Sequence, residues 1–404
     1  MNSEINLINC IITKNDIITP IKRIKSDCFL NPVSKEVYEF LMSYFKSYKN
    51  LPSISVINEK FPDFELQIET TDINYLIDKV LEKKCETDVT DLIIQSTNSL
   101  KEKGSFNALE LIKQRVLEIN STVKPNDDID ITQNTDARFD RYVERAAISG
   151  LIGIPSGFPT MDSITSGFQK GQLILVVGLT GIGKSFLSVF LAAQAWKEGY
   201  KVLFVSLEMG EYDISNRFDC LVAKLGHNDI RRGKLNQEEL IKYKEYLKKL
   251  KDNSKTSFIV SSPIGCTQSD ILALIQEHKP DICYVDYSRL VIDDRGQTDY
   301  KGVSNVVLDL RNFAKDIGLP IVVLNQINRG FDKTLSELPS LQDIAHSFAA
   351  AQDSDLVIAC HATDAMQEDK EMLMGIIKHR NGPNLKLWLK WDLDSGNIQE
   401  KHSA

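Results

Sequence analysis

Residues Gly178–Ser185 place the strongest constraint on how this chain folds. They read GLTGIGKS and match the phosphate-binding pattern G-x-x-x-x-G-K-[ST]. The apolar run Leu173–Val177 before them is typical of a buried parallel strand. The stretch Phe186–Lys197 after them is rich in Leu and Ala and favours a helix. Strand, glycine loop and helix are the context that this motif requires, so the sequence predicts a nucleotide-binding site.

The loop also predicts which atoms meet the nucleotide. Glycines let backbone N–H groups surround a phosphate, and the helix N-terminus adds a favourable dipole. We expect Gly178, Gly181 and Gly183 to form this cradle, Lys184 to reach the β- and γ-phosphates, and Ser185 to ligate Mg²⁺. The expected ligands are therefore ATP and Mg²⁺.

The second half of the chain alternates strand-like and helical segments. This alternation predicts an α/β domain with a mostly parallel sheet and helices on both faces. A turn sequence, Arg380–Pro383, joins the last two expected strands. The expected strands are Leu173–Val177, Val202–Leu207, Phe258–Ser261, Ile282–Val285, Ile321–Leu324, Leu356–Cys360, Met374–Lys378 and Leu385–Trp391.

The first 122 residues have a different pattern. Apolar residues from Val37 to Phe45 follow the spacing of one helix face, with Ser34 as the expected N-cap. The same spacing recurs over Ile73–Leu81 and from about Phe106 to Ile119. We predict an all-α N-terminal domain over residues 1–122, which serves as an interaction module. A turn-rich linker with a short helix at Arg138–Ala147 follows over residues 123–152, and the ATPase domain covers residues 153–404.

Composition excludes several classes of protein. The net charge of −8 gives no general basic surface for nucleic acid, although local contacts in a pore need none. The seven cysteines are scattered without a C-x-x-C pair, which argues against a zinc ribbon or a disulfide framework. The N-terminus lacks the pattern of a signal peptide, and no apolar run is long enough to cross a membrane. We therefore expect a cytoplasmic protein with no membrane partner.

Three strand ends carry side chains suited to ATP hydrolysis. Asp286 ends an apolar run and suits a second Mg²⁺ anchor, with helix capping as the plain alternative. Glu208 is positioned to polarise the attacking water, or is a solvated loop residue. Gln326 suits a sensor of the γ-phosphate, or is a satisfied strand-end amide. Arg380, on the expected hairpin, reads from its pattern alone as a surface arginine, with a finger supplied in trans as the other possibility.

The ordered set of motifs resembles the hexameric replicative DNA helicases of the DnaB type, with a RecA-like motor. The resemblance covers about residues 135–400, and the short, loosely matching N-terminal domain is more similar to phage or mobile-element versions. The motifs that carry it are Gly153–Phe158, Gly178–Ser185, Ser206–Met209, Val285–Tyr287, Leu324–Arg329, Gln352–Asp355 and Lys378–Pro383.

The resemblance implies a ring of six subunits that hydrolyses ATP at subunit interfaces. Single-stranded DNA threads the channel, translocation runs 5′ to 3′, and the duplex is unwound at a replication fork. By this similarity Glu208 is the catalytic base and Gln326 the γ-phosphate sensor, while Lys378 and Arg380 reach the neighbour's γ-phosphate. The linker helix docks on an adjacent motor. Any primase or helicase loader is a separate chain, and the location is a bacterial or phage-infected cytoplasm.

The loop after Gln326, residues 327–339, is the expected DNA contact. Arg329, Gly330 and Lys333 supply donors and close backbone approach for a phosphate, with an ordinary mobile loop as the alternative. The chain departs from the family pattern at two positions, Arg289 and Ala351. Two other functions remain open on the same motifs: a RecA- or RadA-like recombination or repair ATPase, and a nucleotide-dependent loader or switch.

Overall fold

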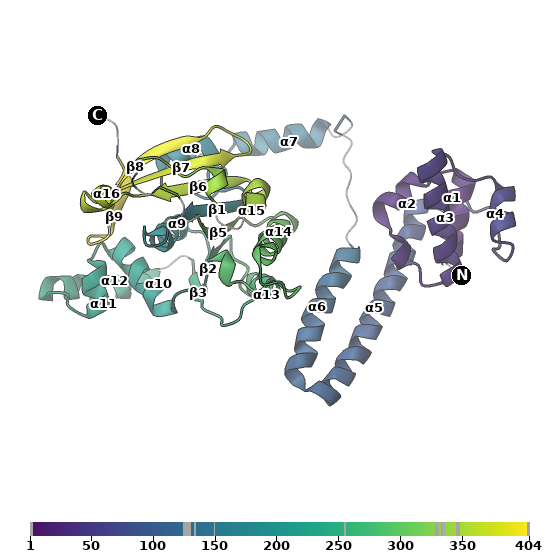
Figure 1. Cartoon of the computed structure of the whole chain (residues 1–404), viewed down its shortest axis with the longest axis horizontal. Coiled ribbons are helices and arrows are strands. Elements are labelled where there is room, and N and C mark those ends of the chain that lie inside the picture. The colour runs from purple at the N-terminus through teal and green to yellow at the C-terminus, as the bar shows by residue number, and fades with distance from the viewer. Residues whose placement is uncertain are drawn as a thin grey trace. The chain divides into compact units, whose positions relative to one another are not determined.

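The chain forms two compact units in the computed structural model, residues 1–138 and 139–404 (Figure 1). The structure describes residues 3–123, 131–132, 135–148, 150–253, 256–327, 331–332, 334, 336–344 and 348–401. The predicted domain boundaries at residues 122 and 152 stay predictions, since the division between the units falls inside a helix.

The first unit is entirely helical over its described residues. A core of aliphatic and aromatic side chains, among them Leu7, Ile11, Val37, Leu41 and Ile77, holds its helices together. Its helices are α1 (Ser3–Lys14), α2 (Ile18–Arg23), the 3₁₀ turn η1 (Ser26–Cys28), α3 (Pro32–Tyr48), α4 (Ile54–Lys60), α5 (Ile73–Lys103) and α6 (Ser105–Val123).

Helix α3 begins earlier than the sequence predicted. The N-cap is Asn31, whose side chain accepts a hydrogen bond from the backbone N–H of Ser34. Pro32 follows at the first helical position, where its fixed φ suits a helix and its missing N–H costs nothing. The prediction of Ser34 as the cap was therefore wrong, because an Asn-Pro pair three residues upstream makes the stronger start signal.

Helices α5 and α6 form a long hairpin. Asp72 caps α5 by accepting hydrogen bonds from the backbone N–H groups of Asn74 and Tyr75. The apolar spacing predicted α5 only over Ile73–Leu81, whereas the helix runs for 31 residues. In its second half, Ile93 and Ile94 are 61% and 53% exposed. These apolar side chains are therefore not buried in the core of the first unit.

A single helix, α7 (Thr135–Ala146), covers the predicted short linker helix. Every residue in it is exposed, including Phe139 and Tyr142 at 65% and 68%. A helix with an exposed aromatic face lacks the packing that usually stabilises a short helix in water.

The second unit contains a nine-stranded sheet in the order β3-β2-β4-β5-β1-β6-β7-β8-β9. The first six strands in this order pair in parallel, and β6 to β9 pair antiparallel. Strand β9, the last in this order, was missed by the sequence analysis because its four residues, Asn-Ile-Gln-Glu, include only one apolar side chain. The strands are β1 (Leu173–Gly178), β2 (Val202–Ser206), β3 (Phe258–Ser261), β4 (Ile282–Asp286), β5 (Ile321–Gln326), β6 (Leu356–His361), β7 (Glu371–His379), β8 (Leu385–Asp392) and β9 (Asn397–Glu400).

Helices cover both faces of this sheet, as predicted. In Figure 1, α9 lies on one side of the central strands and α13 and α14 lie on the other. The helices of this unit are α8 (Pro159–Thr165), α9 (Lys184–Lys197), α10 (Glu211–Ala223), α11 (His227–Arg232), α12 (Gln237–Asn253), α13 (Gln268–His278), α14 (Tyr300–Ile317), α15 (Phe348–Asp353) and α16 (Asp364–Glu368), with the 3₁₀ turns η2 (Ser288–Leu290) and η3 (Leu341–Asp343).

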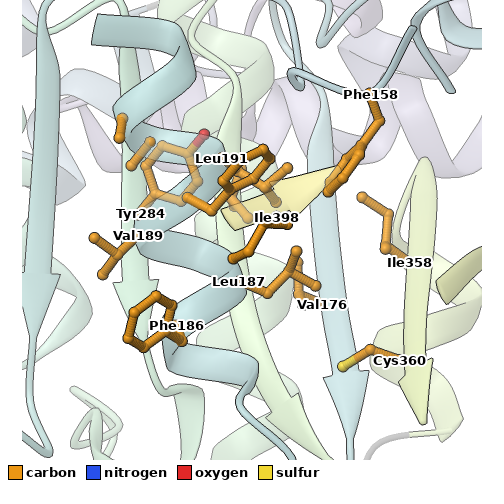
Figure 2. Close-up of a cluster of buried hydrophobic side chains, with 14 of the residues drawn as sticks. Phe158, Val176, Phe186, Leu187, Val189, Leu191, Tyr284, Ile358, Cys360 and Ile398 are labelled. Carbon is orange, nitrogen blue, oxygen red and sulfur yellow. The ribbon is translucent and has the colours of Figure 1, made fainter. Parts of the chain in front are cut away.

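The alternation of side chains along β1 builds two cores. Ile174 and Val176 belong to one cluster with Leu187 and Leu191 of α9. Figure 2 shows Val176, Leu187 and Leu191 of this cluster. Leu175 and Val177 belong to the opposite cluster, with residues of α13 and α14. Each fully buried side chain of this kind contributes about 2 kcal/mol of hydrophobic free energy. Strand β1 is therefore held from both faces, which fixes the position of the loop that follows it.

Within the described part of the chain, no helix has both the length and the apolar character that a bilayer crossing requires.

Candidate active site

The loop between β1 and α9 has the conformation of a phosphate cradle. Gly181 and Gly183 have φ values of 85° and 99°, in the left-handed region that favours glycine. At Gly178 the constraint is space instead, because a Cβ there would lie 2.7 Å from the carbonyl oxygen of Cys360 on β6. Helix α9 then begins at Lys184, so its free N–H groups and its dipole favour an anion at the loop.

Lys184 turns back onto its own loop. Its Nζ donates a 2.7 Å hydrogen bond to the carbonyl oxygen of Leu179. Burial lowers the pKa of Lys184, while the Cys360 thiol and the acidic groups Asp286 and Glu208 oppose that shift. A partly desolvated ammonium held over the cradle is well placed to meet phosphate oxygens.

Asp286 and Ser185 provide the features of a magnesium site. Asp286 is 1% exposed, and its Oδ2 atom has no hydrogen-bond partner among the described residues. Burial raises the pKa of Asp286 to about 6, an effect that the Ser185 hydroxyl, Arg217 and Lys184 counteract and Glu208 reinforces. A buried carboxylate oxygen without a partner, next to a hydroxyl at the phosphate loop, suits a cation that takes oxygen ligands. These residues therefore fit the predicted Mg²⁺.

Glu208 and Gln326 lie at the same edge of the sheet as the cradle. In the parallel register Ser206 is opposite Asp286 and Gly178 is opposite Gln326. Glu208 follows Ser206 by two residues, is exposed and lines a cavity of about 440 Å³ with the loop Ser262–Cys266. The ends of four neighbouring strands, β2, β4, β5 and β1, thus bring an exposed acid, a buried acid, an amide and the cradle together.

Arg217 is a site residue that the sequence analysis missed. It lies on α10, with its guanidinium carbon 5.6 Å from the centre of the Phe186 ring. Burial lowers the pKa of Arg217, while Asp286, Asp213 and Glu208 oppose the shift, so this cation interacts with both candidate acids. No local pattern around Arg217 indicates a site, because only the fold brings α10 against the start of α9.

Trp391 was also missed. Its indole ring forms a wall of the phosphate loop, because a Cβ on Gly183 would lie 3.0 Å from ring atom Cζ2. The ring also makes an edge contact with Phe186, with 6.3 Å between centroids. Gly183 and Trp391 are 208 positions apart in the sequence, so the sequence analysis could not predict this contact.

Lys378 and Arg380 lie near the starting ends of the parallel strands, whereas the phosphate loop follows the carboxyl end of β1. Asp355 precedes β6, and Leu173 is the first residue of β1. The backbone groups of these two residues are hydrogen-bonded, and the Asp355 carbonyl oxygen also accepts a 3.0 Å hydrogen bond from Arg380 N. The Arg380 side chain is 44% exposed and pairs with Asp355 at 2.9 Å. The six residues of β1 separate this edge from the phosphate loop, a span of about 17 Å. The structure therefore does not bring Arg380 into the phosphate site of its own chain.

Lys378 has all of its donors engaged in its own chain. Its Nζ donates to the backbone carbonyl oxygens of Ala351, Gln352 and Ser354, at 2.9, 2.5 and 2.7 Å. The side chain therefore stabilises the C-terminal end of α15, where such carbonyls lack helical partners. A contact with a neighbour's phosphate would require some of these hydrogen bonds to break.

The predicted DNA-contact residues Arg329, Gly330 and Lys333 lie outside the described residues. The described parts of this loop are attached to the sheet edge. Ile327 N–H donates to the Gly178 carbonyl oxygen at 3.3 Å, and Ile327 also pairs with Ile344. The Phe331 ring meets the buried His361 imidazole edge-on at 5.2 Å. The loop thus begins directly beside the phosphate cradle.

The two departures from the family pattern have different surroundings. Arg289 is exposed on η2 and lines a cavity of about 410 Å³. Ala351 is fully buried, and its carbonyl oxygen accepts the hydrogen bond from Lys378. The backbone of residue 351 therefore makes a contact that does not depend on its side chain.

The chain matches the family model of the DnaB-like helicase C-terminal domain over residues 153–400. It is 28% identical to the replicative DNA helicase DnaB of Leifsonia xyli over 295 residues, which cover 70% of this chain and 64% of the relative. It is 27% identical to a probable replicative DNA helicase of Trieres chinensis, covering 73% of this chain and 63% of the relative. The chain thus spans less than two thirds of the length of these curated relatives.

Two of the solved structures that share this fold cover different parts of the chain. One is described as the structure of a DnaB-like replicative helicase and its interactions with primase. It superposes with a TM-score of 0.72 at 18% identity and covers 98% of both chains. The other is an ATPase domain solved by itself, with a TM-score of 0.61 at 22% identity, covering 67% of this chain and 99% of that one. The predicted fold, a RecA-like motor domain with a helical N-terminal unit, is thereby confirmed.

Proposed function

This chain belongs to the DnaB-like helicases, and from that membership we propose that it is a ring-forming motor that hydrolyses ATP to unwind DNA at a replication fork. It moves 5′ to 3′ on single-stranded DNA as a homohexamer, in the cytoplasm of a bacterial or phage-infected cell. The position of Arg380 carries this proposal. Because Arg380 and Lys184 lie at opposite edges of one sheet, the phosphate site gains its finger only from a second copy.

Hydrolysis in this proposal is mostly a matter of position and charge. The cradle and Lys184 bind the phosphates, and Gln326 senses the γ-phosphate. Glu208, exposed at the cavity that it lines with Ser262–Cys266, orients and deprotonates the attacking water. The positive charge of Arg217 attracts the carboxylates of Glu208 and Asp286. When bound, Mg²⁺ is held by Ser185 and Asp286 and neutralises charge on the phosphate oxygens.

We place the DNA contact in the loop after Gln326. Its start is hydrogen-bonded to Gly178, so a change at the phosphates has a short path to the loop. The predicted donors Arg329, Gly330 and Lys333 bind the phosphodiester backbone rather than bases. Contacts of this kind accept any sequence, which a translocating motor requires.

The decisive assay uses a synthetic fork with a free 5′ tail, ATP and Mg²⁺. The wild-type protein is expected to separate the strands, and a fork that has only a 3′ tail is expected to stay paired. The Lys184→Ala variant, which loses the phosphate-binding ammonium, is the control and is expected to be inactive. ATP hydrolysis without strand separation on either fork would contradict the helicase assignment. Open filaments instead of closed rings by electron microscopy would favour a recombinase.

Helix α7 supports assembly into a ring. Phe139, Tyr142 and Val143 share one exposed face, at 65%, 68% and 48%. The helical spacing places acidic residues along one side of this face and arginines along the other. The acidic residues are Asp136, Asp140 and Glu144, and the arginines are Arg138, Arg141 and Arg145. We propose that this face docks on the motor of the next subunit.

Replacing Phe139 and Tyr142 together by Ser is expected to weaken assembly. Each ring buried at an interface contributes about 1.5–3 kcal/mol, so the concentration for half-assembly should rise at least about 100-fold. Mass photometry across protein concentrations, with an ATP analogue, measures this midpoint. The matched control changes Arg141 and Glu144, on the other side of α7, to Ser. Equal midpoints for the two double variants would show that the aromatic face is not an interface.

The first unit suits a collar and a docking module. Exposed apolar residues on the α5–α6 hairpin, such as Ile93 at 61% and Phe106 at 87%, leave surface for other chains. One of the solved structures that share the fold is described as showing that helicase's interactions with primase. We propose that a separate primase and a separate loader act on this helicase.

A further inference from the structure

Asp355 links the start of β1 to Arg380 through four hydrogen bonds. Its Oδ1 atom accepts from Arg380 Nη1 at 2.9 Å, and its Oδ2 atom accepts from the backbone N–H of Leu173 at 3.0 Å. The Asp355 backbone N–H donates to the Leu173 carbonyl oxygen at 2.9 Å, and its carbonyl oxygen accepts from Arg380 N at 3.0 Å. The carboxylate is only 13% exposed, so it is held in a fixed place at the sheet edge.

This contact leaves most of the Arg380 guanidinium available. Among the described residues, its side-chain hydrogen bond to Asp355 uses Nη1 alone. An arginine carries five donors in a planar fork, and two parallel donors match a phosphate or carboxylate. With 44% of its side chain exposed, Arg380 has a free edge that faces outward while one nitrogen stays attached.

We propose that Asp355 is a positioning residue for the trans finger. It holds one end of the Arg380 guanidinium, so that the neighbour's ATP meets a cation that is already oriented. Without this contact, the long exposed side chain of Arg380 would populate many rotamers. The entropy lost on fixing one rotamer would then add to the free energy of the transition state. The inference rests on the proposed role of Arg380 in trans.

The arrangement favours positioning over an inhibitory contact. An inhibitory carboxylate would occupy the fork face of the guanidinium with both oxygens. Here the second oxygen is committed to the Leu173 N–H, and only one guanidinium nitrogen is engaged. The two roles predict opposite effects on turnover when the carboxylate is removed, so the sign of the effect separates them.

The Asp355→Asn variant tests this role in the assembled full-length protein with single-stranded DNA. The amide keeps the size of the side chain but presents an N–H group to either Arg380 or Leu173. We expect kcat for ATP to fall about tenfold or more, with KM and the affinity for an ATP analogue changed less than about twofold. The matched control is Asp353→Asn, an acid two residues away that pairs with Arg311 at 3.6 Å instead. Its turnover should equal that of the wild type.

Two further measurements exclude a merely structural effect. Adding Asp355→Asn to Arg380→Ala should lower kcat no further, because the positioned group is already gone. Mixing Asp355→Asn subunits with Lys184→Ala subunits should restore turnover. An intact phosphate loop from one subunit then meets an intact finger from the other. If the Asp355→Asn chain does not fold, Asp355→Glu is the substitute because it keeps the charge. We expect it to lower kcat as well, but less than Asp355→Asn would.

The inference is overturned by three results. These are wild-type or faster turnover of Asp355→Asn, an additional loss in the double variant, and no recovery on mixing. Its failure differs from failure of the proposed function. If Arg380→Ala itself turns over normally, the finger assignment is wrong. If Arg380→Ala is inactive but Asp355→Asn is not, only the positioning role is wrong.

Discussion

Replacing Arg380 by Ala is expected to lower ATP turnover by about 10³-fold or more while leaving nucleotide binding nearly unchanged. An arginine finger meets charge that develops in the transition state, so its loss appears in kcat rather than in KM. Steady-state hydrolysis with single-stranded DNA, together with titration of a fluorescent ATP analogue, separates the two quantities. Lys386→Ala is the matched control, since Lys386 is an exposed cation on the adjacent strand β8.

Mixing subunits tests whether Arg380 acts in trans. Rings of Arg380→Ala alone and rings of Lys184→Ala alone should both be inactive. A mixture contains interfaces where the intact Lys184 of one subunit meets the intact Arg380 of another, so partial turnover should return. An Arg380→Ala protein that hydrolyses ATP like the wild type, or a mixture that stays inactive, would rule out the role in trans.

Replacing Glu208 by Gln is expected to reduce turnover by about 10²- to 10⁴-fold. The amide keeps the shape of the side chain but cannot accept the proton of the attacking water. ATP should therefore bind and remain uncleaved, which a single-turnover quench with labelled ATP measures directly. Glu211→Gln, at the exposed first position of α10, makes the same chemical change three residues away and should turn over normally. Comparable rates for the two variants would exclude Glu208 as the base.

Local signals explain why one half of the site could be predicted. The cradle, β1 and α9 follow from a single contiguous stretch, because glycine conformation and apolar spacing act over a few residues. Asp286 and Gln326 follow from strand ends, since parallel strands end at one edge of a sheet. Their position beside the cradle agrees with the prediction, and their roles stay predictions.

The other half of the site depends on contacts distant in sequence. Arg217 and Trp391 reach the phosphate loop only through the packing of α10 and β8, for which the chain carries no short pattern. The partners of Lys378 and Arg380 were likewise not predictable. They depend on the strand order, which places β7 beside β6. The family assignment was confirmed from the same motifs. A phage or mobile-element source stays a prediction.

Strand β1 connects the Asp355 contact to the phosphate loop. One end is hydrogen-bonded to Asp355, which pairs with the proposed finger Arg380, and the other end leads into the chain's own phosphate loop. Buried on both faces, the strand transmits a tilt rather than absorbing it. A rotation of about 10° over its length of about 17 Å moves one end by about 3 Å relative to the other. That displacement is enough to make or break a hydrogen bond, so in the proposed ring a movement at one ATP site would reach the finger of the next.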